Sequence, residues 1–337
     1  MKALITGGCG FIGSHVVRAF VADGWDVTNL DKLTYAADPR NLGDISEAPS
    51  YHFVQGDLCD AALVRDLVAG MDLVVNFAAE THVDRSLLDP AVFARTDVEG
   101  VVCLLEAIRA DGHAALVHMS TDEVFGSLAE PEEAGEEWPF APTSPYSASK
   151  AAAELMIRAY CETYGLPVTV LRSCNVFGPN QHIEKFIPLF TMRAIAGEAM
   201  PLYGDGLQQR EWLYVEDLVE AIRQVTHALP ASGLHALHVG SGTRIPNIEI
   251  ARTICRLAER SEALIQPVAD RAGHDRRYAL DCSKLRSMGW HSRVTFEEGL
   301  ARTVDWYRAI ASRLDGGEQF SGYFAQQYGD RLRPPSR

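Results

Sequence analysis

The feature that most constrains the fold is a glycine-rich loop that directly follows the first apolar run of the chain. The stretch "KALIT" has the pattern of a buried strand, "TGGCGFIGS" then places Gly7, Gly10 and Gly13 three residues apart, and an apolar helical pattern follows. Glycines at such a turn let the backbone bend tightly and approach a pyrophosphate that rests against the helix N-terminus. This order of elements predicts the first unit of a dinucleotide-binding sheet.

Strand-like and helix-like stretches alternate after this loop. Helical periodicity covers residues 13–23, 60–69, 91–111 and 148–164, and the apolar runs between them are "DVTNL", "YHFVQ", "DLVVNFA", "ALVHMS" and "VTVLRS". Such alternation predicts an α/β fold with a doubly wound parallel sheet of the Rossmann type.

The alternation of strand-like and helix-like stretches changes after about residue 178, where the chain becomes richer in proline and polar residues. We therefore expect an NAD-binding Rossmann domain with the catalytic residues over 1–178, and a smaller α/β region that binds substrate over 179–312. One late strand-like run, "HALHVGS" at 235–241, is a candidate to return to the main sheet. Residues 313–337 are expected to form a poorly ordered polar tail.

A carboxylate at the end of the second strand bears on the choice of dinucleotide. Asp31 lies 18 residues after Gly13, where it can accept a hydrogen bond from the adenosine ribose 2′-hydroxyl and would repel a 2′-phosphate. The sequence thus predicts NAD rather than NADP. Asp57, after the third strand, could accept from the adenine amino group or could instead cap the next helix; the sequence leaves both open.

Composition excludes several classes of function. A net charge of −14 with no long basic run argues against binding to nucleic acid or to an anionic membrane surface, and no apolar run approaches a membrane span. The seven cysteines are scattered without a C-x-x-C, and the 11 histidines show no ligand spacing. We expect a cytoplasmic protein without a signal peptide, a disulfide framework or a metal site.

Tyr146 and Lys150 are candidate catalytic residues because their i and i+4 spacing on a predicted helix puts both on one face. A tyrosine with a pKa near 10 is a poor base at neutral pH. A nearby ammonium and a positively charged nicotinamide ring would favour the phenolate.

An acidic pair follows the strand that ends at Ser120 and Thr121. Neighbouring side chains on a strand point to opposite faces, so two carboxylates that share a task must lie just past the strand end, as Asp122 and Glu123 do. A solvated polar turn is the alternative interpretation. If burial separates their pKa values, one carboxyl group can act as an acid and the other as a base.

These stretches together resemble one enzyme family. The motifs "TGGCGFIGS", "DKLTYAADPRNL", "FAAETHVDRS", "STDEVFG", "YSASK", "EKFIPLF", "YGDGLQQREWLYVEDL" and "RAGHDRRYALDCSKL" are similar to those of the nucleoside-diphosphate-hexose 4,6-dehydratases, which are extended short-chain dehydrogenases/reductases. The resemblance covers residues 1 to about 308. It implies tightly bound NAD⁺, a dTDP-sugar substrate such as dTDP-glucose, and a homodimer.

The resemblance also implies a role for each catalytic residue. Tyr146 would take the proton from the sugar O4 during oxidation at C4, and Thr121 would hydrogen-bond O4. Glu123 would remove the C5 proton and Asp122 would protonate the departing C6 hydroxyl. Hydride return to C6 would leave a 4-keto-6-deoxy sugar.

Binding residues follow from the same matching. The expected cofactor-binding residues are Gly7, Gly10, Phe11, Ile12, Gly13, Asp31, Lys32, Leu33, Thr34, Asp57, Leu58, Phe77, Ala78, Ala79, Thr81, Thr96, Tyr146 and Lys150. The expected substrate-binding residues are Ser86, Thr121, Asp122, Glu123, Asn175, Lys185, Phe186, Pro201, Tyr203, Arg210, Asn247, Arg271, His274 and Tyr278. Three of the latter are cations that would offset a diphosphate.

The chain departs from the family pattern at three positions. Phe125 replaces the usual Tyr and Val176 replaces a second Asn, which would remove polar groups near the nucleotide and sugar, while Asp97 puts a carboxylate where an amide is common. Another nucleoside-diphosphate hexose therefore remains an alternative substrate.

Two other functions stay open on the same scaffold. One is a nucleotide-sugar epimerase or decarboxylase, which the acidic pair argues against. The other is a non-catalytic NAD-binding protein, which the intact Thr121, Tyr146 and Lys150 argue against.

For the dimer, we expect residues 91–111 and 148–164 to form a four-helix bundle with their copies. The alternative is that both apolar stripes of residues 148–164 are buried inside one subunit.

Overall fold

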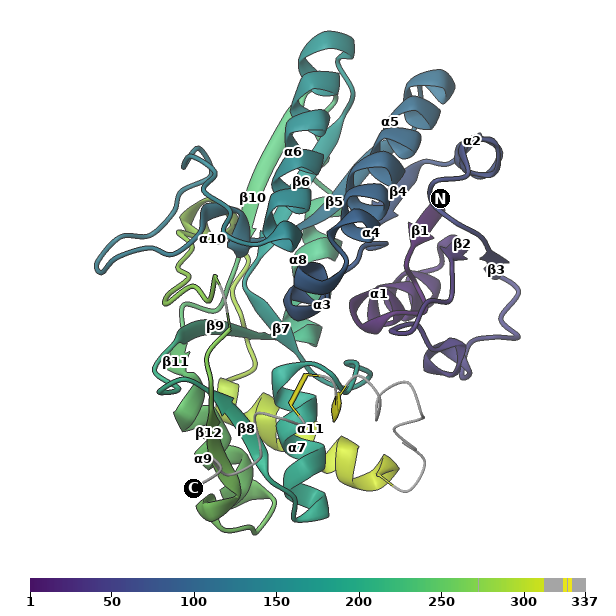
Figure 1. Ribbon diagram of the computed structural model, residues 1–337. Helices are drawn as coiled ribbons and strands as arrows, with labels where there is room; N and C mark the ends of the chain where they lie inside the picture. Colours follow the sequence, from purple (N-terminus) through teal and green to yellow (C-terminus); the bar gives the residue numbers. More distant parts are fainter. Residues whose placement is uncertain (272, 312–323, 326, 329–337) are drawn as a thin grey trace.

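The computed structural model describes residues 1–271, 273–311, 324, 325, 327 and 328. Its centre is a seven-stranded parallel sheet with the strand order β10-β6-β5-β4-β1-β2-β3 (Figure 1). The strands are Lys2–Thr6 (β1), Asp26–Asp31 (β2), Tyr51–Gln55 (β3), Leu73–Asn76 (β4), Ala115–Thr121 (β5), Val168–Ser173 (β6) and Leu234–Val239 (β10). The predicted doubly wound α/β fold is confirmed, and the late strand does return to the sheet beside β6.

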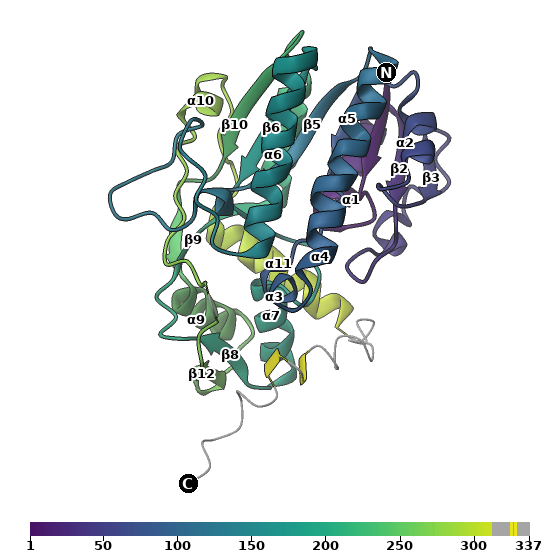
Figure 2. The same cartoon turned by 45° about the horizontal axis from the view of Figure 1, so that its top comes forward.

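Helices cover both faces of this sheet (Figure 2). On one face Val16 and Phe20 of α1 (Phe11–Ala22) share a core with Leu218 and Ile222 of α8 (Val215–Thr226). On the other, α2 (Ala61–Val68), α5 (Gly100–Asp111) and α6 (Pro145–Tyr164) build a second core. Because both faces are buried, the strands appear in the sequence as continuous apolar runs.

The predicted helix over residues 91–111 is a continuous helical run with a change of hydrogen bonding inside it. Pro90–Phe93 (α4) is α-helical, Ala94–Glu99 (η2) is π-helical, and α5 follows. Such π segments often occur at functional sites, because they redirect side chains within a helix. Here the π segment carries Thr96 and Asp97.

The second region lies below the carboxyl ends of the main strands in Figure 1. It contains a three-stranded sheet in the order β11-β9-β7, a parallel pair of β8 and β12, and a separate core around Phe190, Ile254 and Leu300. Its strands are Asn175–Phe177 (β7), Met200–Tyr203 (β8), Gln209–Tyr214 (β9), Arg244–Pro246 (β11) and Ile265–Val268 (β12). Its main helices are Phe186–Ala196 (α7), Asn247–Leu257 (α9) and Phe296–Ile310 (α11).

The remaining elements are short. They are Pro39–Leu42 (η1), Val83–Leu88 (α3), Asp122–Phe125 (η3), Glu262–Leu264 (η4) and Ser283–Ser287 (α10). No helix in the described part of the chain is both long enough and apolar enough to cross a membrane.

The two regions are interleaved along the chain. After entering the second region, the chain returns to the main sheet for α8 and β10, and Leu285 of α10 packs in the core beneath that sheet. The division at residue 178 stays a prediction about function rather than a continuous structural boundary.

Part of the expected C-terminal tail is placed by the structure. Phe324 and Tyr328 pack into the core of the second region, and Gln327 Nε2 donates to Tyr203 Oη at 2.8 Å. These aromatic side chains thus lie on an apolar surface, and the poor order of the tail stays a prediction. Residues 312–323, 326 and 329–337 lie outside the described residues.

Candidate active site

The site opens where the winding of the sheet reverses. β1 pairs with β2 on one side and β4 on the other, and a crevice forms at the carboxyl ends of strands at such a switch point. A cavity of about 300 Å³ lies there, and a second of about 170 Å³ adjoins it within the second region. Both are lined by Thr81, Glu123, Asn175, Val176, Gln181 and Lys185.

The glycine loop forms one wall of the larger cavity. Gly7 has a φ of +71°, and a Cβ there would lie 2.7 Å from Ala78 N, while a Cβ on Gly13 would lie 2.2 Å from Gly7 O. No side chain caps α1, so the N–H groups of its first turn remain available for an anion. The loop therefore fits a pyrophosphate, as the sequence predicts.

Asp31 lines the same cavity. Its Oδ2 accepts from Cys9 N at 2.9 Å and its Oδ1 from Leu33 N at 2.8 Å, so two backbone groups fix the carboxylate. Burial raises the pKa of Asp31, and these two hydrogen bonds oppose the rise. A carboxyl group held in this position fits NAD better than NADP.

Asp57 also lines the larger cavity, but it does not cap a helix. Its carboxylate lies 2.7 Å from Lys32 Nζ and accepts from Cys59 N at 3.0 Å. Asp60 caps α2 instead, accepting from the N–H groups at residues 62 and 63. The N-cap interpretation of Asp57 is therefore wrong, whereas contact with adenine stays a prediction.

Tyr146 and Lys150 are held by the start of α6. Ser144 and Ser147 form a reciprocal capping box around Pro145, which fixes where the helix begins and puts both catalytic candidates on the cavity wall. Lys150 Nζ donates to Met119 O on β5 at 2.8 Å.

Burial raises the pKa of Tyr146 well above 10, Glu123 and Asp97 raise it further, and a hydrogen bond with Thr121 lowers it. Activation of this tyrosine by Lys150 and by the cofactor's positive charge stays a prediction.

The acidic pair is not a solvated turn, because Asp122 is buried and Glu123 is half-buried at the cavity wall. Asp122 is 3% exposed, its Oδ1 accepts from Thr121 Oγ1 at 3.1 Å, and its Oδ2 has no hydrogen-bond partner among the described residues. Thr121 also caps the turn η3 by accepting from Glu123 N at 3.2 Å. The polar-turn interpretation is wrong.

The surroundings of the two carboxyl groups differ. Burial, and then the charge of Glu123, raise the pKa of Asp122 well above its usual range. Burial also raises the pKa of Glu123, but the cations Arg271, Arg210 and Lys185 oppose that rise. The pair can therefore hold one proton on Asp122 while Glu123 is ionised.

The structure brings most of the predicted binding residues to the two cavities. Lining the larger one are Gly7, Gly10, Phe11, Ile12, Gly13, Asp31, Lys32, Thr34, Asp57, Leu58, Phe77, Ala78, Ala79, Thr81, Thr96, Thr121, Asp122, Glu123, Tyr146, Lys150, Asn175 and Lys185. Lining the smaller one are Glu123, Asn175, Lys185, Phe186, Pro201, Tyr203, Arg210, Asn247, Arg271 and His274.

Three predicted residues lie outside both linings. Leu33 packs against the core near α1, and Ser86 Oγ donates to Val83 O within α3 at 2.6 Å. Tyr278 is 2% exposed, and its hydroxyl lies 3.4 Å from Glu123 Oε2 and 2.8 Å from Asp275 Oδ2. Tyr278 is thus placed to orient Glu123, and direct contacts of all three with ligands stay predictions.

The three departures from the family pattern have different surroundings. Val176 lines both cavities, as expected. Phe125 does not, because its ring packs against Phe140 and beneath the Arg172 guanidinium, 5.2 Å from the ring centroid; the expectation that it changes the polarity of the site is wrong. Asp97 lies beneath the site and accepts from Ser149 Oγ at 2.7 Å and from Glu80 N at 2.9 Å.

The sequence reasoning missed several lining residues. The added members of the two linings include Glu80, His82, Gln181, His182, Glu184, Trp212 and Tyr328. Burial raises the pKa of Glu80 to about 6, with Asp97 contributing. The sequence offered one signal for Glu80, because it precedes the predicted binding residue Thr81 in "FAAETHVDRS". It offered no signal for Tyr328, because the contacts of Tyr328 depend on how the chain end folds back.

Comparisons with known proteins identify the family. Residues 4–303 match the family model described as GDP-mannose 4,6 dehydratase. A dTDP-glucose 4,6-dehydratase of Streptomyces niveus is 46% identical over 316 residues, which are 91% of this chain and 93% of that protein. The chain belongs to this dehydratase family.

Solved structures show how the family scaffold is shared. The dTDP-glucose 4,6-dehydratase of Streptomyces venezuelae, solved with NAD, is 42% identical with a TM-score of 0.90, over 94% of this chain and 99% of that one. A UDP-glucose 4-epimerase of Thermus thermophilus, also solved with NAD, is 34% identical with a TM-score of 0.83, over 91% and 99%. The fold thus accommodates both reactions, and side chains at the site must distinguish the dehydratase from the epimerase.

Proposed function

We propose that this protein is a dTDP-glucose 4,6-dehydratase, a hydro-lyase that works with tightly bound NAD⁺ and forms dTDP-4-keto-6-deoxyglucose. The observation that carries the proposal is the Asp122–Glu123 pair, in which Asp122 is buried and Glu123 is half-buried at the cavity wall. Glu123 lines both cavities, so it lies where the dinucleotide site and the proposed sugar-nucleotide site meet. Relatives of the dehydratase family that are 42% and 46% identical carry this name, and one is solved with NAD.

The first task of the site is to oxidise the sugar at C4. The bound cofactor supplies hydride acceptance and return. Tyr146 accepts the O4 proton, Thr121 hydrogen-bonds O4, and Lys150 supports the tyrosine from the next turn of α6. The new 4-keto group acidifies the C5 proton.

The second task is to remove water across C5 and C6. Glu123 takes the C5 proton as its ionised form, and Asp122 gives a proton to the departing C6 hydroxyl. Tyr278 Oη donates to Glu123 Oε2 at 3.4 Å and so helps to orient this base. An epimerase has no need for this acid and base pair, and that difference favours dehydration.

The smaller cavity supplies the charge that a diphosphate needs. Lys185, Arg210 and Arg271 line it, and all three lower the pKa of Glu123, which places their charges close to that carboxyl group. Phe186 and Tyr203 add aromatic walls that suit a nucleotide base.

Purified protein incubated with dTDP-glucose and no added NAD tests the proposal. We expect the 4-keto-6-deoxy product by NMR, with UDP-, CDP- and GDP-glucose turned over more slowly. Formation of dTDP-galactose would favour the epimerase, and absence of any product with bound NAD present would favour a non-catalytic NAD-binding protein.

We also propose a homodimer through α5 and α6. The outward face of α6 carries Ala148, Ala152, Leu155 and Ala159, and Leu155 is 57% exposed. Leu87, Leu88 and Val92 on the neighbouring α3 and α4 are also exposed. This apolar strip is the kind of surface that a second copy would cover.

The seven cysteines are all free thiols, which supports the predicted cytoplasmic location.

A further inference from the structure

We propose that Asp84 is a positioning residue that presents Arg271 and Tyr203 to the nucleoside diphosphate of the substrate. This inference rests on the proposed function, because it concerns how the same cavity holds a dTDP-sugar. Asp84 lines neither cavity, so it acts through the two residues that it binds rather than by touching the ligand.

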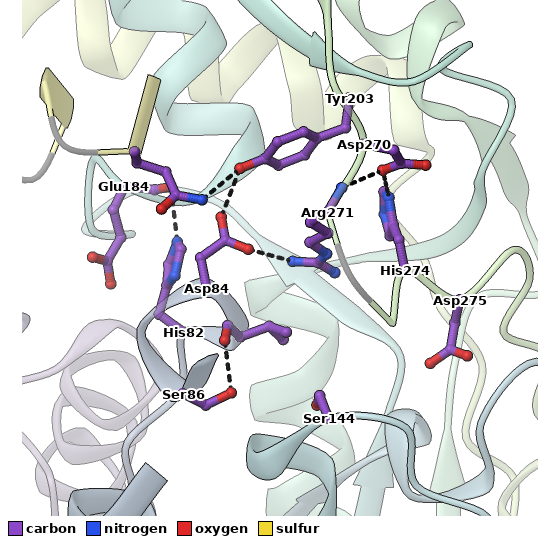
Figure 3. Close-up of polar contacts among 12 residues, drawn as sticks. His82, Asp84, Ser86, Ser144, Glu184, Tyr203, Asp270, Arg271, His274 and Asp275 are labelled. Atoms are coloured by element: carbon purple, nitrogen blue, oxygen red, sulfur yellow. Dashed lines mark hydrogen bonds and ion pairs between the residues drawn. The ribbon is translucent and has the colours of Figure 1, made fainter. Parts of the chain in front are cut away.

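Asp84 joins parts of the chain that are far apart in sequence. It lies in the first turn of α3, while Arg271 and Tyr203 belong to the second region (Figure 3). Asp84 Oδ1 accepts from Arg271 Nη1 at 3.1 Å, and Oδ2 accepts from Tyr203 Oη at 2.9 Å. Each oxygen of one carboxylate thus fixes one wall residue of the smaller cavity.

The carboxylate is built to stay charged. Its side chain is 2% exposed, and burial alone would raise its pKa. The effect of burial is outweighed by the charges of Arg271 and His82 and by the hydrogen bond from Tyr203. The pKa of Asp84 therefore lies below its usual range. A buried anion with a partner on both oxygens is a rigid anchor rather than a solvated surface charge.

Arg271 keeps donors for a ligand while it is anchored. Arg271 lines the smaller cavity, and its buried Nε has no hydrogen-bond partner among the described residues. A guanidinium offers five N–H donors in a fixed plane, so the bond to Asp84 sets the direction of the others. Those donors suit the oxygens of a diphosphate.

Tyr203 is held from two sides. Its hydroxyl bonds Asp84 and also receives Gln327 Nε2 at 2.8 Å, while its ring lies 5.8 Å from the Tyr328 ring. The ring itself lines the smaller cavity beside Phe186. Asp84 therefore fixes the plane of an aromatic wall at the same time as it fixes the arginine.

Two physical effects of removing the charge oppose each other. An Asp84→Asn substitution removes a negative charge next to a diphosphate site, which alone would tighten binding of dTDP. It also removes the anchor of Arg271 and Tyr203, which weakens binding. If Asp84 is a positioning residue, the second effect is the larger.

The test compares Asp84→Asn with wild type by KM and kcat for dTDP-glucose and by the Kd of dTDP from titration calorimetry. We expect KM and Kd to rise by about 10- to 100-fold with a smaller fall in kcat, since a misplaced binding group can cost a factor of this size. Bound NAD should be unchanged, because Asp84 does not line the larger cavity. Unchanged or tighter binding of dTDP would overturn the inference.

Two further variants separate positioning from general stability. Asp217→Asn is the matched control, because Asp217 of α8 is also 3% exposed, accepts from the backbone N–H groups of Arg293 and Val294, and lines neither cavity. It should lower the Tm without changing Kd for dTDP. In an Arg271→Gln background, Asp84→Asn should weaken dTDP binding by a smaller factor than in wild type, since only Tyr203 remains to be positioned. An undiminished effect would contradict action through Arg271.

The measurement of dTDP affinity also keeps this inference separate from the proposed function. Wild-type protein that binds dTDP but gives no 4-keto product would refute the dehydratase assignment while Asp84 is still judged by dTDP affinity. Wild-type protein that binds dTDP no more tightly than Asp84→Asn would refute the inference.

Discussion

Burial determines what the carboxyl groups of Asp122 and Glu123 can do. Both lie past the end of β5 in a turn that Thr121 caps, so they enter the site together. Arg210 opposes the rise in the pKa of Asp122, whereas Arg271, Arg210 and Lys185 all favour the ionised form of Glu123. The assignment of acid and base follows from these surroundings rather than from the identity of the two residues.

At the residue scale, the two acids should fail differently. Glu123→Gln lacks the base, so neither exchange of the C5 hydrogen with solvent nor product formation should occur at more than a trace. Asp122→Asn keeps the base, so C5 exchange should persist while product formation falls about 10²- to 10⁴-fold. NMR in deuterated water measures both, with Asp217→Asn as the buried-carboxylate control. Equal loss of exchange in the two variants would contradict the assignment.

The alkaline side of the pH profile follows from the same assignment. Because burial raises the pKa of Asp122, its protonated form extends to higher pH than for an ordinary carboxyl group, and activity is lost as pH rises through that pKa. In Asp122→Asn this alkaline limb of the kcat profile should vanish, leaving a lower kcat that changes less with pH. An alkaline limb of unchanged position in the variant would assign it to another group.

Where a motif fixes the backbone, the sequence predicted which residues line the larger cavity, and their roles stay predictions. Gly7, Asp31, Tyr146 and Lys150 lie where their motifs require. Phe125 did not, because a side chain past the turn can face either the site or the core, and only the stacking of Arg172 over its ring decides this.

At the scale of elements, α6 serves two surfaces. Its inner face holds Tyr146 and Lys150 at the cavity and Ile157 in the core, while its outer face carries exposed Leu155. Side-chain contacts join it to α5, since Tyr160 Oη lies 2.7 Å from Glu106 Oε1 and the Arg109 guanidinium lies 4.9 Å from the Tyr164 ring centroid. The two helices thus form one unit.

A charge on that outer face should break the proposed dimer. In the proposed dimer, Leu155→Glu would bury a carboxylate at the interface between the two subunits, which costs free energy. We therefore expect this variant to be a monomer by sedimentation velocity where wild type is a dimer. Leu207→Glu is the matched control, because Leu207 is 49% exposed and lies on neither helix. A wild-type monomer at all concentrations would remove the dimer proposal.

Sequence periodicity predicted the long elements well, because their apolar spacing reflects which face is buried. It did not indicate the π-helical Ala94–Glu99, since the same apolar residues suit an α-helix and the difference lies in backbone hydrogen bonds. It also could not show that Asp97 would meet Ser149 of α6, a contact made across 52 residues of sequence.

At the scale of the whole molecule, a buried histidine lies where the two regions meet. His82, just before α3, is 7% exposed and lies beside Glu184 of the second region. Burial lowers its pKa from 6.5 to about 4, although Glu184 favours the charged form. The folded protein therefore holds this histidine neutral at pH values where the unfolded chain protonates it.

This difference predicts acid sensitivity. The stability from neutral His82 is fully present above pH 6.5 and is lost as pH falls towards about 4, costing about 2 kcal/mol of unfolding free energy by pH 5. Urea unfolding at pH 7 and pH 5 measures the loss, and His82→Asn should reduce it by that amount. Equal losses in variant and wild type would show that folded His82 binds its proton normally.

Contacts between distant segments were the part that the sequence could not provide. Asp84 meets Tyr203 and Arg271 across 119 and 187 residues, and Tyr328 lines the smaller cavity although the sequence of the chain end looked merely polar. No local pattern encodes such meetings, because they depend on the path of the chain through both regions.

The most direct test of the dehydratase account follows one hydrogen atom of the substrate. Purified protein, with no cofactor added, is given dTDP-glucose that carries deuterium at C4, and the product is read by NMR. The account predicts deuterium at C6 and a solvent hydrogen at C5 of a 4-keto-6-deoxy sugar. Deuterium that stays at C4, in recovered glucose or in its 4-epimer, would contradict it.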